Sequence, residues 1–177
     1  MRSVATEDFE ALVAAYRPKV FRFAMASLRD ADAAQTVTQD CFLKAFQAWG
    51  RFRRECSLDT WLMTIAVNLV RDSVRNRRLQ FWKRTSQAAE PPEIVERTLA
   101  GCGPTPEAQI ILSEQVKAVW AAAAVLPERQ RTVFLLRFVE EMELLEIAAA
   151  TGMKEGTVKA HLFQALRTVR QRVGAIR

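Results

Sequence analysis

Apolar residues recur every three or four positions along most of this chain, the spacing of one face of an α-helix. Three such stripes follow one another in the first half, each long enough for a core-facing helix. Their apolar positions are Phe9, Leu12, Val13, Tyr16, Val20, Phe23 and Ala24; Val37, Cys41, Phe42, Ala45, Phe46 and Trp49; and Leu58, Trp61, Leu62, Ile65, Ala66, Leu69 and Val70. We expect the second helix to start after a turn at 30–32 and the third to be capped by Ser57 or Asp59. Pro18 should kink or split the first helix, because proline lacks a backbone N–H.

The helical pattern fails between residues 85 and 106. The stretch TSQAAEPPEIVERTLAGCGPT contains three prolines and two glycines and has no apolar period. Such a composition is typical of a linker. Alternation of apolar and polar residues, the signal of a strand, is nearly absent from the whole chain. The sequence therefore predicts an all-α fold of two small helical lobes, 1–84 and 107–177, joined by a flexible linker over 85–106.

The second lobe ends in the most specific local pattern. One helix should stop at Pro127, which then opens the next helix at its first position. A short helix over 144–151 should end at Gly152, where a positive φ is expected. The last helix should begin at 154–156, and its inward residues are Val158, Leu162, Ala165, Leu166 and Val169. Two helices joined by a tight glycine turn form a helix-turn-helix, here 143–162, which places its second helix in the major groove of DNA.

Charge supports a nucleic-acid partner. The 177 residues carry a net charge of +6, and the pI is about 9.7. Six basic residues face one acidic residue in 71–84, and six face one in 154–177, whereas ten acidic residues face five basic ones in 85–153. A basic run is often only a solvated face, but two of them on helical patterns favour binding to a polyanion.

The last helix has an outward face with side chains that can read DNA. We expect base-edge contacts from Glu155, Thr157, Lys159, Ala160, His161 and Gln164, and phosphate contacts from Arg167, Arg170 and Arg172. The alternative to DNA binding is an ordinary helical hairpin with a solvated surface. The basic charge of this segment favours the DNA interpretation.

Catalytic and metal chemistry has little support. The only histidine is His161, and the three cysteines (Cys41, Cys56 and Cys102) are interpreted as small buried hydrophobes rather than as zinc ligands or disulfides. A cluster of Asp30, Asp32 and Asp40 could suggest a metal-dependent nuclease, but cap and turn roles account for these residues better. Since a phosphate loop and a nucleophile–base set are also missing, we expect a protein that is not an enzyme and needs no cofactor.

The apolar runs are too short for membrane insertion. A bilayer-spanning helix needs about 20 apolar residues, and charged residues interrupt every run well before that length. The first residues do not have the pattern of a secretory signal. We therefore expect a reduced, cytoplasmic protein.

Two long stretches together resemble a known family. They are QDCFLKAFQAWGRFRRECSLDTWLMTIAVNLVRD, at 39–72, and LPERQRTVFLLRFVEEMELLEIAAATGMKEGTVKAHLFQALRTVRQRV, at 126–173. Their order and content strongly resemble the extracytoplasmic-function (ECF) group of bacterial RNA polymerase sigma factors, which keep only regions 2 and 4. The resemblance implies that 1–84 is region 2, that 107–177 is region 4, and that the linker lies near the polymerase active-site cleft.

The resemblance also implies partners. Region 2 of the family docks on the clamp helices of the largest catalytic subunit of core RNA polymerase and captures a flipped base of the minus-ten element from the non-template strand. Region 4 meets the flap of the second large subunit and reads the minus-thirty-five duplex. An anti-sigma factor, often bound to a membrane, commonly silences such proteins by covering their polymerase-binding faces.

The resemblance assigns these roles to particular residues of this chain. The polymerase-binding stretch maps to 36–49, with Thr36, Gln39, Asp40, Phe42, Lys44 and Phe46. The minus-ten pocket maps to Ala48, Phe52, Met63 and Asn68, and the strand backbone to Arg51, Arg53, Arg54, Arg71 and Arg75. The minus-thirty-five residues map to Glu155, Thr157, Lys159, Ala160, His161, Gln164 and Arg167. The family usually has an acid at Thr36, often an aromatic at Met63, and often a base at His161 and Gln164.

One alternative is an autonomous helix-turn-helix regulator with an oligomerisation or sensor lobe at its N-terminus. Such a lobe would need neither the pocket segment over 51–68 nor the docking pattern over 39–46, so the sigma-factor interpretation is favoured. A third alternative, a nuclease or recombinase, would need carboxylates that converge or a nucleophile beside a base. The sequence indicates neither, so this alternative is not favoured.

Overall fold

The computed structural model describes residues 3–85 and 116–174. Their helices are α1 (Ser3–Leu28), α2 (Ala31–Ala48), the short 3-10 turn η1 (Trp49–Arg51), α3 (Leu58–Thr85), α5 (Glu128–Phe138), α6 (Leu144–Thr151) and α7 (Glu155–Gly174), together with helical residues 116–124. Strands do not occur in this part of the chain, which confirms the all-α prediction. The predicted linker lies almost wholly outside the described residues.

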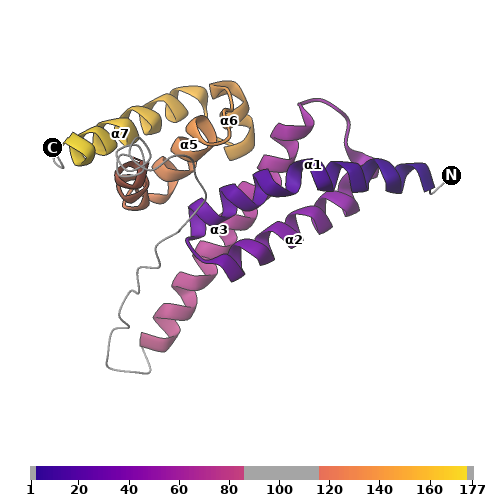
Figure 1. The fold of residues 1–177 in the computed structure, drawn as a ribbon, viewed down its shortest axis with the longest axis horizontal. Helices are drawn as coiled ribbons and strands as arrows, with labels where there is room; N and C mark the ends of the chain where they lie inside the picture. The colour runs from indigo at the N-terminus through magenta and orange to yellow at the C-terminus, as the bar shows by residue number, and fades with distance from the viewer. Residues whose placement is uncertain (1–2, 86–115, 175–177) are drawn as a thin grey trace, which may run out of the picture.

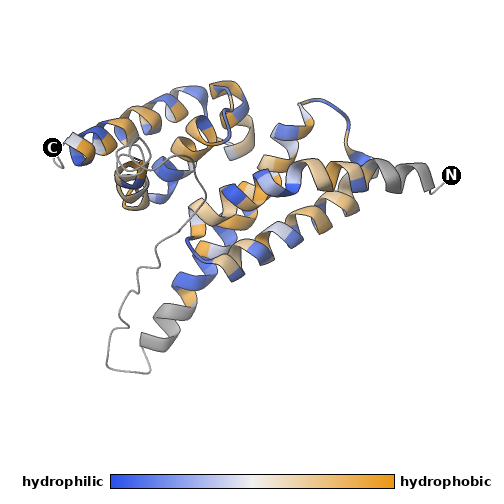
Figure 2. Ribbon diagram, in the orientation of Figure 1, coloured by the Kyte–Doolittle hydropathy of each residue, from blue (hydrophilic) through white to orange (hydrophobic). Residues whose placement is uncertain are grey.

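The first lobe is a three-helix bundle of α1, α2 and α3, which contact one another in all three pairs (Figure 1). Its core contains Val20, Phe23 and Ala24 from α1, Ala34, Val37, Cys41 and Ala45 from α2, and Leu62, Met63 and Ala66 from α3. Apolar residues gather on the sides of the helices that face one another (Figure 2). Burying each large side chain contributes about 1.5–3 kcal/mol, so the three stripes explain why the bundle forms.

Two prolines bear on the sequence-based prediction. Of the two predicted effects of Pro18, a kink or a split, the split does not occur: Pro18 lies inside the single helix α1 with an exposed ring. Leu12 before the proline and Val20 after it are buried in the same core, so packing on both sides offsets one lost backbone hydrogen bond. Pro127 is the N-cap of α5 rather than its first residue.

Polar caps set the starts of α2 and α3. The Asp30 carboxylate accepts a hydrogen bond from the Ala33 amide at 2.8 Å, so α2 begins at Ala31, inside the predicted turn. A second Asp30 oxygen pairs with Arg77 of α3 at 2.8 Å. Ser57, one of the two predicted caps, accepts from the Thr60 amide at 3.1 Å. Each cap satisfies an amide that the helix itself leaves unpaired.

Removing the α2 cap should destabilise the first lobe. We expect Asp30→Ala to lower the free energy of unfolding by about 1 kcal/mol at about pH 7, whereas Asp30→Asn should keep most of it because asparagine caps equally well. The Ala33 amide, with the nearby Arg77 charge, holds the pKa of the Asp30 carboxyl below its usual value. A lowered folded pKa means that the stabilisation is present above the unfolded pKa and is lost as the pH falls through the folded one.

Urea unfolding of the three proteins at about pH 7 and about pH 2 checks this prediction. The gap between wild type and the alanine variant should shrink at the lower pH. A gap of the same size at both values would contradict the role assigned to the carboxylate.

The second lobe packs α5, α6 and α7 together. The capping box at the start of α6 pairs the side chains of Glu143 and Glu146 with each other's backbone amides. Gly152 then turns the chain with φ 69°, which confirms the predicted helix over 144–151 and its glycine turn. Of the predicted inward residues of α7, Val158, Ala165 and Val169 are buried, and Leu162 and Leu166 are half-buried.

The lobes also touch each other. Helix α6 packs on α3, and α5 packs on α1, so the helix-turn-helix lies against the bundle (Figure 1). None of the helices in the described ranges is both long and apolar enough to cross a bilayer.

Candidate functional site

One face of α2 is exposed. The predicted residues Thr36, Gln39, Asp40 and Lys44 are exposed. Two large apolar side chains lie among them: Leu43, 56% exposed, and Phe46, 53% exposed. Each of these six residues lies three, four or seven positions from others of the six, which places them on one side of the helix. They form a continuous surface, which we call the α2 face.

Phe42 does not belong to the α2 face. It is buried in the bundle core, because positions 34, 37, 41 and 45 of the same helix face inward with it. Leu43 was missed by sequence reasoning, although its place one turn after Gln39 and Asp40 was a signal that could have identified it.

The loop from Arg51 to Ser57 carries exposed positive charge. Arg51, Arg53 and Arg54 are all exposed, and Arg54 has φ 57°, in the left-handed region that a non-glycine residue seldom adopts. The pair of Arg53 with Glu55 is loose, at 4.0 Å between two exposed side chains. The guanidinium groups therefore remain available to phosphates.

An aromatic cluster supports this loop. The ring of Phe52 lies 4.7 Å from that of Trp61 and 6.3 Å from that of Trp49, with which it is stacked at 18°. The ring of Phe9 packs edge-on against that of Trp49, with 5.5 Å between the ring centroids. Trp61, expected in the core, is half-buried, and the role of Trp49 was not anticipated. Phe52, itself half-buried, is thus held in one orientation with part of its ring accessible.

Helix α3 adds polar side chains beside the cluster. Asn68 is exposed and follows Trp61 by seven residues, which places it on the same face about 10 Å along the axis. Arg71 and Arg75 are also exposed. Met63 is only 1% exposed and lies in the bundle core, so the structure does not bring it to this surface.

The predicted recognition helix α7 presents a polar surface. Thr157, Lys159, Ala160, Gln164 and Arg167 are exposed, as are Arg170 and Arg172. His161, predicted to point outward, is half-buried, because it lies between the exposed positions and the inward Leu162.

Three of the predicted base-reading residues of α7, namely Glu155, Lys159 and Gln164, have partners within the lobe. The Lys159 ammonium pairs with Glu155 at 2.6 Å, and the Gln164 amide oxygen accepts from Gln130 at 2.8 Å. These exposed contacts are weak, so they orient the side chains without preventing contact with a ligand.

Among the described residues, no three side chains of His, Cys, Asp or Glu come close enough to hold a metal ion. Cys41 is buried as predicted, and burial raises the pKa of its thiol to about 12. The prediction was wrong for Cys56, which is exposed because it lies in the loop before α3. Cys102 lies outside the described residues.

Family models match most of the chain. The model described as Sigma-70 region 2 matches residues 12–80, and that described as Sigma-70, region 4 matches residues 117–169. The RNA polymerase sigma-H factor of Pseudomonas aeruginosa is 32% identical, over 89% of this chain and 81% of its own. The ECF RNA polymerase sigma factor SigW of Bacillus subtilis is 24% identical, over 94% and 89%.

Solved structures share the fold. The sigma factor RpoE of Bartonella quintana, solved in complex with the anti-sigma factor NepR, has a TM-score of 0.77 at 22% identity, covering 97% of this chain and 99% of its own. CnrH, solved in complex with the cytosolic domain of CnrY, has a TM-score of 0.67 at 20% identity, covering 96% and 90%. At these identities the similarity concerns the arrangement of the helices.

Proposed function

Because this chain belongs to the ECF sigma factors of the sigma-70 family, we propose that it binds core RNA polymerase and directs it to particular promoters. The observation that carries the proposal is the presence of both family regions in order, each with an open polar surface: the α2 face and the α3 surface in region 2, and α7 in region 4. The domains are region 2 at 1–84, a linker at 85–106 and region 4 at 107–177. The protein contributes binding and no catalysis, and it acts in the cytoplasm.

The α2 face docks on the clamp helices of the largest polymerase subunit. Leu43 and Phe46 supply apolar anchors, and Gln39, Asp40 and Lys44 supply a polar rim. Protein interfaces concentrate their affinity in such central apolar side chains, and the surrounding charges set orientation and register.

The minus-ten element binds as a single strand at the loop and α3. A flipped base stacks on the exposed part of Phe52, and each such stack contributes about 1–3 kcal/mol. Asn68 reads the edge of the base, since its amide both donates and accepts hydrogen bonds. Arg51, Arg53 and Arg54 hold the backbone, which makes the binding dependent on salt.

The minus-thirty-five element binds as a duplex at α7. Thr157, Lys159, Ala160 and Gln164 enter the major groove, and Arg167 contacts a phosphate. Region 4 also meets the flap of the second large subunit. Two modest DNA contacts on one polymerase act together through their effective concentration, so neither lobe needs high affinity alone.

An anti-sigma factor is the proposed regulator. The sigma factor RpoE of Bartonella quintana, which has the same fold, was solved in complex with the anti-sigma factor NepR. In this chain the exposed rings of Trp120 and Phe138 lie near the junction of the lobes and provide apolar surface for a partner.

Transcription in vitro tests the proposal. The full chain is mixed with core polymerase and a library of promoter sequences, and the transcripts are sequenced. Initiation should require both components and should come from templates that share a minus-ten and a minus-thirty-five sequence. If the chain alone protects duplex DNA and never redirects core polymerase, the autonomous regulator is the correct interpretation.

A further inference from the structure

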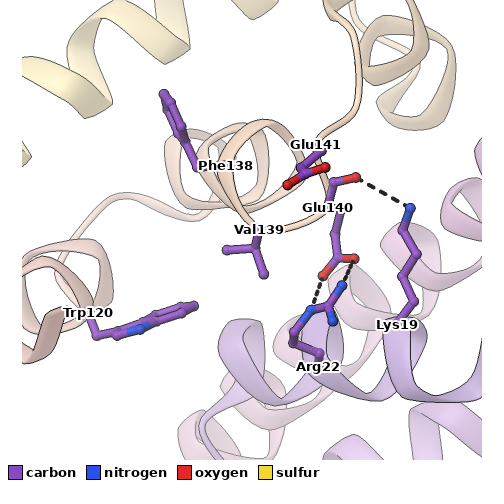
Figure 3. A pocket seen from close by; sticks show the side chains of 7 residues that line it. All are labelled: Lys19, Arg22, Trp120, Phe138, Val139, Glu140 and Glu141. Carbon is purple, nitrogen blue, oxygen red and sulfur yellow. Dashed lines mark hydrogen bonds and ion pairs between the residues drawn. The ribbon is translucent and has the colours of Figure 1, made fainter. Parts of the chain in front are cut away.

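A buried acid joins the two lobes. Glu140 follows α5, and its side chain is 0% exposed. Its two carboxylate oxygens accept hydrogen bonds from Arg22 of α1, from Nε at 3.1 Å and from Nη2 at 2.7 Å. Lys19, one turn earlier on α1, donates to the backbone oxygen of Glu140 at 3.3 Å and to Asp59 at 2.7 Å. Figure 3 shows both cations of region 2 directed at this one residue of region 4.

The burial of Glu140 depends on Arg22. A buried carboxylate without a partner costs several kcal/mol, whereas a bidentate guanidinium pair compensates much of that cost. The hydrogen bonding of the Arg22 guanidinium to the Glu140 carboxylate raises the pKa of Arg22. Because the Arg22 side chain is half-exposed, it stays hydrated when the lobes separate. Glu140 is also hydrated again on separation, so the contact can open without leaving a buried, unpaired charge.

A second set of contacts joins the helix-turn-helix to the strand-binding side of α3. The Thr60 hydroxyl donates to the Glu146 carboxylate at 3.2 Å, and Ser57 lies 3.5 Å from the same oxygen. Arg71 donates to the backbone oxygen of Thr151 at 3.4 Å. The family resemblance assigns Arg71 to the backbone of the minus-ten strand, and Ser57 ends the arginine-bearing loop. Region 4 therefore occupies part of the surface that the DNA strand would use.

This arrangement cannot read a whole promoter. The minus-ten and minus-thirty-five elements are separated by roughly 25 base pairs, which is about 85 Å at 3.4 Å per base pair. In the structure α6 packs directly on α3. The lobes must therefore move apart before both elements are bound.

We propose that Glu140, Arg22 and Lys19 form a latch that holds the free protein in a closed, self-inhibited state, in which region 4 covers part of the minus-ten binding surface. The inference rests on the proposed function, since it concerns the regulation of that same site. In the closed state Arg71 is engaged with Thr151, so the strand meets a surface with one cation fewer.

One end of the junction between the lobes is not closely packed. A cavity of about 520 Å³ lies beside the latch, lined by Lys19, Arg22, Trp120, Phe138, Val139, Glu140 and Glu141. At this end of the junction the lobes meet through polar contacts beside a gap, whereas α6 packs on α3 elsewhere. Interfaces of this kind allow domains to move relative to each other, and an open state a few kcal/mol higher remains populated.

A charge swap in the full-length protein tests the latch. Arg22→Glu and Glu140→Arg each place like charges opposite each other, and the double variant restores the pair in reverse, with room for the arginine in the adjoining cavity. Glu10→Arg is the matched control, since it makes the same change of charge at an exposed residue of α1 that lies outside the cavity beside the latch. Small-angle scattering should give a radius of gyration near the roughly 16 Å of a compact chain for wild type, with an increase of at least about a fifth for each single variant.

The double variant should lose at least half of that increase in the radius of gyration, and Glu10→Arg should scatter as wild type does. Single variants that stay compact, or a double variant as expanded as the singles, would overturn the latch. Far-ultraviolet circular dichroism should be the same for all five proteins, and restoration in the double variant excludes misfolding as the cause.

Binding of a labelled single-stranded minus-ten oligonucleotide without polymerase tests the inhibition. The oligonucleotide is taken from the promoters that the transcription experiment selects. Each expanded variant should bind it several-fold more tightly than wild type, and the double variant should not. Expansion with unchanged binding would overturn self-inhibition. A wild-type chain that fails to redirect core polymerase would instead contradict the proposed function, because the scattering result does not depend on it.

Discussion

Asn68→Ala is expected to reduce discrimination between the correct and incorrect minus-ten base by roughly ten- to a hundredfold, because a side chain that pairs with a base edge contributes about 1–3 kcal/mol of discrimination. Asn68 is exposed on α3 and has no part in the core. Alanine is also the best helix former, so the fold should not suffer. Binding to core polymerase should stay at the wild-type level.

The measurement is the affinity of the reconstituted holoenzyme for single-stranded oligonucleotides that differ at one minus-ten base. Asn76→Ala is the matched control, since Asn76 is also an exposed asparagine of α3 but lies two turns further from the aromatic cluster. The control should discriminate as wild type does. If Asn68→Ala loses its affinity for polymerase, the base pocket lies elsewhere.

Leu43→Arg should weaken binding to core polymerase by about thirtyfold or more, the loss expected for a central apolar anchor worth about 2 kcal/mol. Leu43 is 56% exposed in the middle of the α2 face. A guanidinium there would have to be desolvated against the partner, whereas it stays hydrated in the free protein, so the stability of the chain should barely change.

Leu79→Arg provides the control, because Leu79 is 53% exposed and lies on α3, away from the α2 face. Fluorescence anisotropy with labelled chain and core polymerase, without DNA, compares the two variants. Leu79→Arg should bind as wild type does. Equal losses in both variants would show that a general gain of positive charge, and not the α2 face, controls the affinity.

Much of the fold follows from local patterns. The helices, the Ser57 cap and the turn at Gly152 were all predicted, because each depends on residues within a few positions of one another. For Pro18 the sequence left two outcomes open, a kinked α1 or a split one, and the helix is not split. Whether a helix tolerates a proline depends on what its two halves pack against, and that is decided by α2 and α3.

The site was less predictable than the fold for the same reason. Phe42 and Leu43 are neighbours with similar hydrophobicity, yet one is in the core and the other is exposed. The pattern of a helix that is apolar on two sides does not say which side its neighbours cover. Met63 was placed in the base pocket by its sequence position, and the packing of α3 in the bundle instead buries it.

By itself the sequence determined an all-helical chain of two lobes with a helix-turn-helix at its end, because helical period, caps and glycine turns are local properties. Only the tertiary structure decided how the lobes meet. Arg22 and Glu140 are separated by 118 positions, and no periodicity connects them. Their pairing depends on the way α5 and α6 pack on α1 and α3, which brings a buried carboxylate to the cations that stabilise it.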